Sequence, residues 1–292
     1  MRDKKTINDI ILPAPYSPKE IESVRNSSGR TPRGLYRVLW GNPWRDDKKR
    51  NYYEKFSTAL RFDFLWLKNN PFEIAARTPF FVFGTDNERR LSDMGFKCIL
   101  IDRRHTIYPH SHTYLHKIMA WDMATSIYDQ SVCLDIDCQM VSELPHDFWE
   151  MHDQKEDVQV PLYYSTKGES YSPWRDGDGK LYKPCACYVF LRGNAIAKKI
   201  LATMEKVKSG LTVDFTEEVV LAKVTDDIVG GWKGAEEYAK RFEPCAFSTG
   251  QVKGMNGPAV PIFSHLIKLN MVRRKLKEMG VDYSKAVIGE KS

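Results

Sequence analysis

The sequence predicts an α/β protein: one domain in which a mainly parallel sheet is flanked by helices. Two observations lead to this fold class. Apolar segments of strand length alternate with amphipathic segments of helix length along the first half of the chain, and this order builds parallel sheets. The 292 residues, of which 42% are hydrophobic and 28% charged, are also enough to bury one large core.

The alternating elements run from residue 34 to residue 129. We expect strands at GLYRVLWG (34–41), TPFFVFG (78–84) and FKCILID (96–102). We expect helices at YYEKFSTALRFDFLWLKNN (52–70), NERRLSDMG (87–95) and HTYLHKIMAWDMATSIYD (112–129). Ligands of such sheets bind beyond the carboxyl ends of the strands, so functional residues are expected there.

The two ends of the chain differ from the middle. Residues 1–33 are rich in turn formers and charge and predict a surface arm, residues 34–270 form the predicted domain, and residues 271–292 a C-terminal helix and tail. No apolar run has the length of a membrane helix and the first residues lack the core of a secretory signal, so we expect no membrane span and a cytoplasmic protein.

The six cysteines have no framework spacing and predict reduced core residues. Cys185 and Cys187 are too close in sequence for a zinc pattern, and we interpret them as ordinary strand residues. The net charge of +6 is mild. It permits anionic ligands such as nucleotide phosphates without singling out nucleic acid.

The stretch SVCLDIDCQMVSELP (131–145) places two carboxylates at the end of a buried strand. Residues i and i+2 of a strand share a face, so Asp135 and Asp137 should project together with Cα atoms ~6 to 7 Å apart. Two like charges so close are tolerable beside a divalent cation, and Mg²⁺ or Mn²⁺ prefers such oxygen ligands. A bare Asp-x-Asp also occurs by chance, often in solvated turns, and the strand context favours the metal.

The helix before this strand carries Lys117. At 100° per residue, this lysine lies far from the polar stripe of Asp122, Thr125, Ser126 and Asp129 and among residues that should be buried. Two interpretations stay open: a side chain that snorkels over apolar surface, or a cation aimed into a site.

Together these segments resemble the GT-A-type nucleotide-sugar glycosyltransferases, and most of all the glycogenin-like branch (family 8), in which a helix with a lysine precedes a strand that ends in Asp-x-Asp. The resemblance implies a GT-A-like, Rossmann-type domain. It also implies that Asp135 and Asp137 hold Mn²⁺ or Mg²⁺, which in turn holds the diphosphate of a UDP-sugar. Asp135 and Lys117 would contact this donor.

Three later segments extend the resemblance. KPCACYVFLRGNAIAKKILATM (183–204) resembles the pocket strand and helix, without the family's Asn-x-Gly. DFTEEVVLAKV (214–224) places Glu217 and Glu218 at the aspartate and glutamine of an Asp-Gln-Asp motif. PIFSHLIKLN (261–270) places His265 as the third metal ligand and Lys268 as a diphosphate contact, although this lysine follows the histidine by three positions rather than six and no glycine is present.

The resemblance implies a metal-dependent, hexosyltransferase-like enzyme. The metal, Lys117 and His265 would stabilise the charge that builds on the leaving phosphate. Glu217 and Glu218, and next Asp214, are the candidates for a carboxylate that acts at the acceptor. Acids at a helix start are also ordinary, so a structural role for these residues stays open. The branch implies that the anomeric configuration is retained.

The acceptor is not identified by the sequence: a glycan, a protein, a small molecule or a modified DNA base fits. Residues 163–182 predict a long surface loop in which Trp174 offers a platform for a sugar or base, or packs the loop down. Asp176 to Gly179 predicts a hairpin turn. A nucleotidyltransferase would use the same carboxylates and metal, and a binding module without catalysis would keep only the fold.

Overall fold

The computed structural model describes the core of the chain. The described residues are 33–44, 57–72, 75, 77–108, 112–140, 142–144, 148–153, 157–165, 174–175, 181–208, 217–229, 247–249, 263–265 and 269–282.

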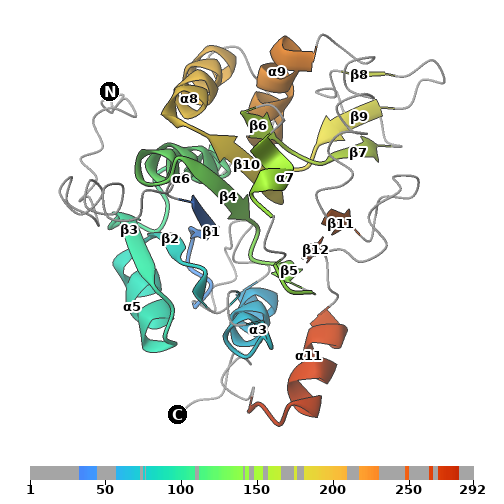
Figure 1. Ribbon diagram of the computed structural model, residues 1–292. Coiled ribbons are helices and arrows are strands. Elements are labelled where there is room, and N and C mark those ends of the chain that lie inside the picture. Colours follow the sequence, from blue (N-terminus) through green and yellow to red (C-terminus); the bar gives the residue numbers. More distant parts are fainter. Residues whose placement is uncertain are drawn as a thin grey trace, which may run out of the picture.

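A sheet of six strands forms the centre of the protein (Figure 1). Its spatial order is β3-β2-β1-β4-β10-β6. The first four of these strands are mutually parallel, whereas β10 is antiparallel to β4 and to β6. The predicted α/β class with a mainly parallel sheet is therefore confirmed. The strands are β1 (Arg33–Leu39), β2 (Phe80–Phe83), β3 (Cys98–Asp102), β4 (Gln130–Leu134), β6 (Val158–Gln159) and β10 (Tyr188–Arg192).

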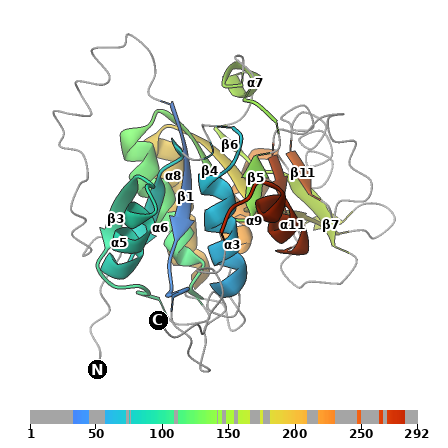
Figure 2. The same ribbon diagram turned by 90° about the horizontal axis from the view of Figure 1, so that it is seen from below.

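Helices cover both faces of this sheet (Figures 1 and 2). On one face, α6, α8 and α9 bury apolar side chains against β1, β2, β3 and β10. On the other face, α3 and α5 do the same against β1 and β2. The helices are α3 (Ser57–Lys68), α5 (Thr85–Asp93), α6 (Leu115–Ile127), α7 (Glu150–Asp153), α8 (Asn194–Lys208), α9 (Glu217–Val229) and α11 (Leu269–Glu278).

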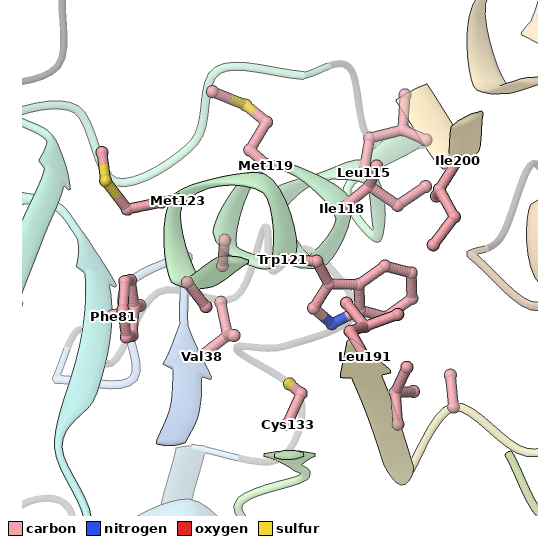
Figure 3. Close-up of a cluster of buried hydrophobic side chains, with 14 of the residues drawn as sticks. Val38, Phe81, Leu115, Ile118, Met119, Trp121, Met123, Cys133, Leu191 and Ile200 are labelled. Carbon is pink, nitrogen blue, oxygen red and sulfur yellow. The ribbon is translucent and has the colours of Figure 1, made fainter. Parts of the chain in front are cut away.

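The most deeply buried helix is α6, which lies between the sheet and α8 (Figure 3). Trp121 is fully buried and lies between α6 and Leu191 of β10 in the same view. The polar stripe of α6 is only partly exposed, because the Asn194 side chain at the start of α8 donates a hydrogen bond of 3.1 Å to the Thr125 hydroxyl. This polar contact joins α6 to α8 together with an apolar one, in which Ile200 of α8 lies near Leu115 and Ile118 of α6 (Figure 3).

Two small three-stranded sheets complete the described fold. One has the order β11-β12-β5 and the other β7-β9-β8. The second includes residues 163–165, 174–175 and 181–182 of the segment predicted to be a long loop, so that prediction is wrong for these residues. The rest of that segment lies outside the described residues. The strands are β5 (Cys138–Met140), β7 (Leu162–Ser165), β8 (Trp174–Arg175), β9 (Leu181–Pro184), β11 (Phe247–Thr249) and β12 (Phe263–His265).

The pairing of β8 with β9 is antiparallel, as expected for a hairpin around Asp176 to Gly179. At the C-terminal end, α11 packs against α3 through Val272 and Leu276, which meet Phe62 and Trp66. Of the predicted arm (residues 1–33), residues 1–32 lie outside the described part of the chain, as do residues 283–292, whereas Arg33 begins β1. No helix within the described part has the length and apolar character needed to cross a membrane.

Candidate functional site

The strand order reverses direction between β1 and β4. From β1 the chain adds β2 and then β3 on one side, and it returns to place β4 on the other side of β1. In open α/β sheets the ligand lies at such a reversal, outside the carboxyl ends of the two strands. Asp135 directly follows the last residue of β4. The topology thus puts one predicted metal ligand at the place where this class of fold binds its ligands.

Residues 135–138 form a turn, not a continuation of the strand. The backbone N–H of Cys138 donates to the carbonyl oxygen of Asp135 at 3.0 Å, and the Asp135 N–H donates to the Cys187 carbonyl at 2.9 Å. The expectation that Asp135 and Asp137 share one face of a strand is therefore wrong. The chain turns here because β5, which follows at once, belongs to a different sheet. Both carboxylates sit on this 135–138 turn and are half-buried.

Lys117 joins this turn to a second carboxyl group. Its Nζ lies 2.5 Å from Asp135 Oδ1 and 2.8 Å from Glu217 Oε1. The side chains of Lys117 and Glu217 are 5% and 4% exposed, while that of Asp135 is 23% exposed. The ammonium is therefore held between two carboxyl groups and does not snorkel to solvent. We call these three residues the Lys117 cluster.

The burial of Glu217 changes its acidity. Removal from water raises the pKa of the Glu217 carboxyl to about 7, against the opposing attraction of Lys117, and the nearby charges of Glu218 and Asp135 add to the rise. Glu217 opens α9. An ordinary acid at a helix start stays in solvent, whereas Glu217 points inward to Lys117. Glu218, the next residue, is half-buried.

The backbone of His265 returns to the same region. In the antiparallel pair of β12 with β5, His265 lies opposite Cys138, the last residue of the 135–138 turn. Directly opposed residues in such pairs have Cα atoms ~4.5 to 5.5 Å apart. The His265 side chain lies outside the described part. Among the side chains that the structure describes, no group of three or more His, Cys, Asp or Glu could hold a metal ion.

The remaining predicted site residues fall beyond the description. Asp214 and Lys268 lie outside the described residues, and of Trp174 only the backbone, in β8, is described. Their predicted roles stay predictions.

The two cysteines of CAC lie in a turn before β10, which corrects their interpretation as strand residues. Their Sγ atoms are 2.7 Å apart, and burial raises the pKa of the Cys187 thiol well above its usual value. The carbonyl oxygen of Ala186, between them, lies 3.5 Å from Lys117 Nζ. This turn meets the 135–138 turn because β4 ends at the edge of the sheet where the antiparallel β10 begins.

The end of β1 lies at the same edge of the sheet and is held firmly. Asn87, fully buried, donates to the carbonyl oxygens of Gly41 at 2.9 Å and Phe83 at 2.6 Å. Its Oδ1 accepts a bond of 2.8 Å from the Trp44 indole. Residues 41–44 contain one glycine, so this described part does not match the glycine-rich phosphate loop that a nucleotidyltransferase requires.

One residue of the site was not found by sequence reasoning. Arg37, in the middle of β1, is 1% exposed and its guanidinium bonds the 135–138 turn. A charged residue inside the apolar strand GLYRVLW was the available signal.

Comparisons with protein-family models and with curated proteins find no match to this chain.

Proposed function

We propose that the protein is a metal-dependent glycosyltransferase that moves a sugar from a nucleotide-diphosphate sugar, most simply a UDP-sugar, to an acceptor. The observation that carries this proposal is the Lys117 cluster at the reversal of strand order. A buried ammonium there contacts the first aspartate of the Asp-x-Asp motif and a second, distant carboxyl group. The GT-A resemblance implies a lysine and two aspartates at the donor diphosphate, and this arrangement agrees with it.

The side chains proposed as metal ligands are of types that suit a hard divalent cation. Asp135 and Asp137 lie on one turn, and His265 is brought opposite the end of that turn by strand pairing. Carboxylate oxygens with one imidazole suit Mn²⁺ or Mg²⁺, whose other positions belong to water and phosphate oxygens. When bound, such an ion acts as a Lewis acid and screens the negative charge of a diphosphate.

Lys117 supplies a positive charge on the protein side of this site. The Lys117 side chain is almost completely buried, so the attraction of its ammonium for a developing phosphate charge is stronger than it would be in water. Because Asp135 and Glu217 fix the ammonium from two directions, it needs no rearrangement when that charge appears. Lys117 thus fits the role of an electrostatic stabiliser of the leaving group.

Glu217 is the titratable carboxyl group of the site. With a pKa of about 7 it holds or releases a proton at neutral pH. In an inverting transfer, such a group would accept the proton that the acceptor hydroxyl loses as it attacks the sugar. The resemblance to the glycogenin-like branch favours retention of the anomeric configuration, and the acceptor class stays open between glycan, protein, small molecule and modified DNA base.

The proposal is tested by binding of the donor. The purified chain is melted with each common nucleotide-sugar, with Mn²⁺ and again with EDTA, because a ligand that binds only the folded state raises the melting temperature. We expect at least one UDP-sugar to raise the melting temperature only when Mn²⁺ or Mg²⁺ is present. The second measurement is hydrolysis of the same donor, monitored through the UDP that is released.

A negative result is also informative. If no nucleotide-sugar shifts the melting temperature with either metal, the proposal is wrong. If a nucleoside triphosphate with a sugar phosphate yields pyrophosphate instead, the protein is a nucleotidyltransferase that uses the same carboxylates.

A further inference from the structure

Arg37 is a buried cation in the central strand of the sheet. It is 1% exposed, and its neighbours on the same face of β1 are Leu35 and Leu39, both apolar and buried. Desolvation of a cation costs several kcal/mol even after relaxation. Burial accordingly lowers the pKa of Arg37, while the negative charges of Asp63 and Asp135 oppose that shift. An apolar side chain would fill the position at less cost, so the guanidinium must be explained by what it binds.

Its partners are the two ends of the 135–138 turn. Arg37 Nη1 donates to the carbonyl oxygen of Asp135 at 2.5 Å and to that of Cys138 at 2.9 Å. The Asp135 carbonyl also accepts the bond of the turn itself, from the Cys138 N–H. One nitrogen of Arg37 therefore ties the first residue of the turn to the last. Within β1, Arg37 is the register partner of Leu134, the residue that precedes the turn.

A second buried side chain holds the middle of the turn. Gln139, fully buried in β5, donates from Nε2 to the Ile136 carbonyl at 2.9 Å and to Asp63 Oδ1 of α3 at 3.3 Å. Three of the four carbonyl oxygens of the turn thus have fixed donors beneath them.

We propose that Arg37 is a positioning residue of the candidate site: by bridging the Asp135 and Cys138 carbonyls it fixes the turn that presents Asp135 and Asp137 to a metal-bound nucleotide. The identity of the ligand in this inference rests on the proposed function. The hydrogen bonds of Arg37 to the turn do not depend on that function. A turn at the end of a strand is ordinarily mobile, whereas metal and catalytic groups must be held within ~0.5 Å of their productive positions. Arg37 reaches neither ligand nor metal and acts through the backbone.

The test compares Arg37→Met with Arg37→Lys and with Val38→Ala. Methionine keeps length and removes the donors, whereas lysine keeps a cation that can bond both carbonyls. Val38 is 3% exposed and belongs to the core on the opposite face of β1, so its alanine variant controls for a destabilised sheet. The first measurement is hydrogen exchange of the Cys138 and Asp135 amides. The second is the dissociation constant for UDP with Mn²⁺.

For Arg37→Met we expect the Cys138 amide to exchange at least tenfold faster than in Val38→Ala, and the affinity for UDP with Mn²⁺ to fall at least tenfold. Arg37→Lys should recover most of both. Unchanged exchange in Arg37→Met, or an affinity within twofold of that of Val38→Ala, would overturn the proposal. If Arg37→Met does not fold, loss of UDP affinity in Arg37→Lys with intact Cys138 protection would overturn it as well.

The two proposals fail separately. If the wild-type chain binds no nucleotide, the glycosyltransferase proposal falls. The exchange rates of Cys138 and Asp135 still decide whether Arg37 clamps the turn, because they need no ligand.

Discussion

The backbone of His265 is paired with that of Cys138, so a residue from the last part of the chain lies beside the turn that carries Asp135 and Asp137. Two sheets meet at this point, because β4 ends in the central sheet and β5 begins in the small sheet that holds β12. If the protein is a glycosyltransferase of the proposed kind, we expect a histidine near the two aspartates. The strand register places the backbone of His265 beside the turn that carries them.

Asp137→Asn should abolish metal-dependent nucleotide binding. Asp135 is already engaged with Lys117, so we expect Asp137 to be the main carboxylate ligand of the metal, and its amide would lose the charge. Calorimetric titration of UDP with and without Mn²⁺ measures the effect. Asp93→Asn, on the exposed end of α5, is the control and should bind as the wild type does. Unaltered Mn²⁺ dependence in Asp137→Asn would contradict this role.

Lys117→Met should destabilise the fold by about 3 to 5 kcal/mol, because it leaves the buried Glu217 and the adjacent Asp135 without their shared cation. Glu217→Gln added to it should recover part of that loss, since the second variant removes one buried charge. Urea unfolding of the wild type, the two single variants and the double variant forms a double-mutant cycle. Lys198→Met, exposed on α8, should change stability little. Strictly additive effects of Lys117 and Glu217 would show that the pair is not coupled.

The stability should depend on pH through Glu217. Its pKa is about 7 in the folded protein and 4.5 ordinarily, so between these values the folded state binds more protons than the unfolded state. Below the ordinary pKa of 4.5, the free energy of unfolding is not reduced by Glu217. As the pH rises from there towards 7, the free energy of unfolding falls by up to about 3 kcal/mol, because the buried carboxyl must lose its proton.

Melting temperatures of wild type and Glu217→Gln, measured from about pH 4 to about pH 8, test this prediction. The difference between the two proteins should change over that range, because glutamine does not titrate there. Parallel pH profiles would mean that Glu217 keeps its ordinary pKa.

Gly84→Ala should cost more stability than Gly95→Ala. Both glycines have positive φ, 95° and 92°, so each alanine costs about 1 to 3 kcal/mol in backbone strain. Only at Gly84 would the new Cβ collide with the imidazole of His105. His105 Nδ1 lies 3.0 Å from the Gly41 carbonyl oxygen, so the collision would also disturb the end of β1. Equal unfolding free energies of the two variants, measured in urea, would contradict this contact.

The first half of the fold follows from the sequence pattern because each strand and helix there has its own period and its own end. The stretch before Gly95, for example, is a helix that closes at this residue with φ of 92°. The residues around Trp174 were harder to interpret, since strands of two to four residues leave little periodicity. Their pairing is decided by tertiary contacts.

The candidate site was predictable to the same limited degree. Asp135 and Lys117 are marked by a charge beside or within an apolar segment, and the structure brings them together. The turn of the backbone after Leu134 and the role of Arg37 could not be predicted from the sequence. Both depend on the fact that β5 belongs to a different sheet from β4. A sequence pattern shows that a residue is buried, but it does not show which distant carbonyl groups that residue will meet.

The pairing of β1 with β4 also has a consequence for how the chain folds. Residues 33–37 lie against residues 130–134, so the central seam of the sheet closes a long loop of chain, and such closures slow folding more than local contacts do. The Lys117 cluster draws on α6, the end of β4 and the start of α9, and so spans this seam and a still longer loop. No early, local fragment of the chain contains the site. Nucleotide binding should therefore appear during refolding only with the last kinetic phase.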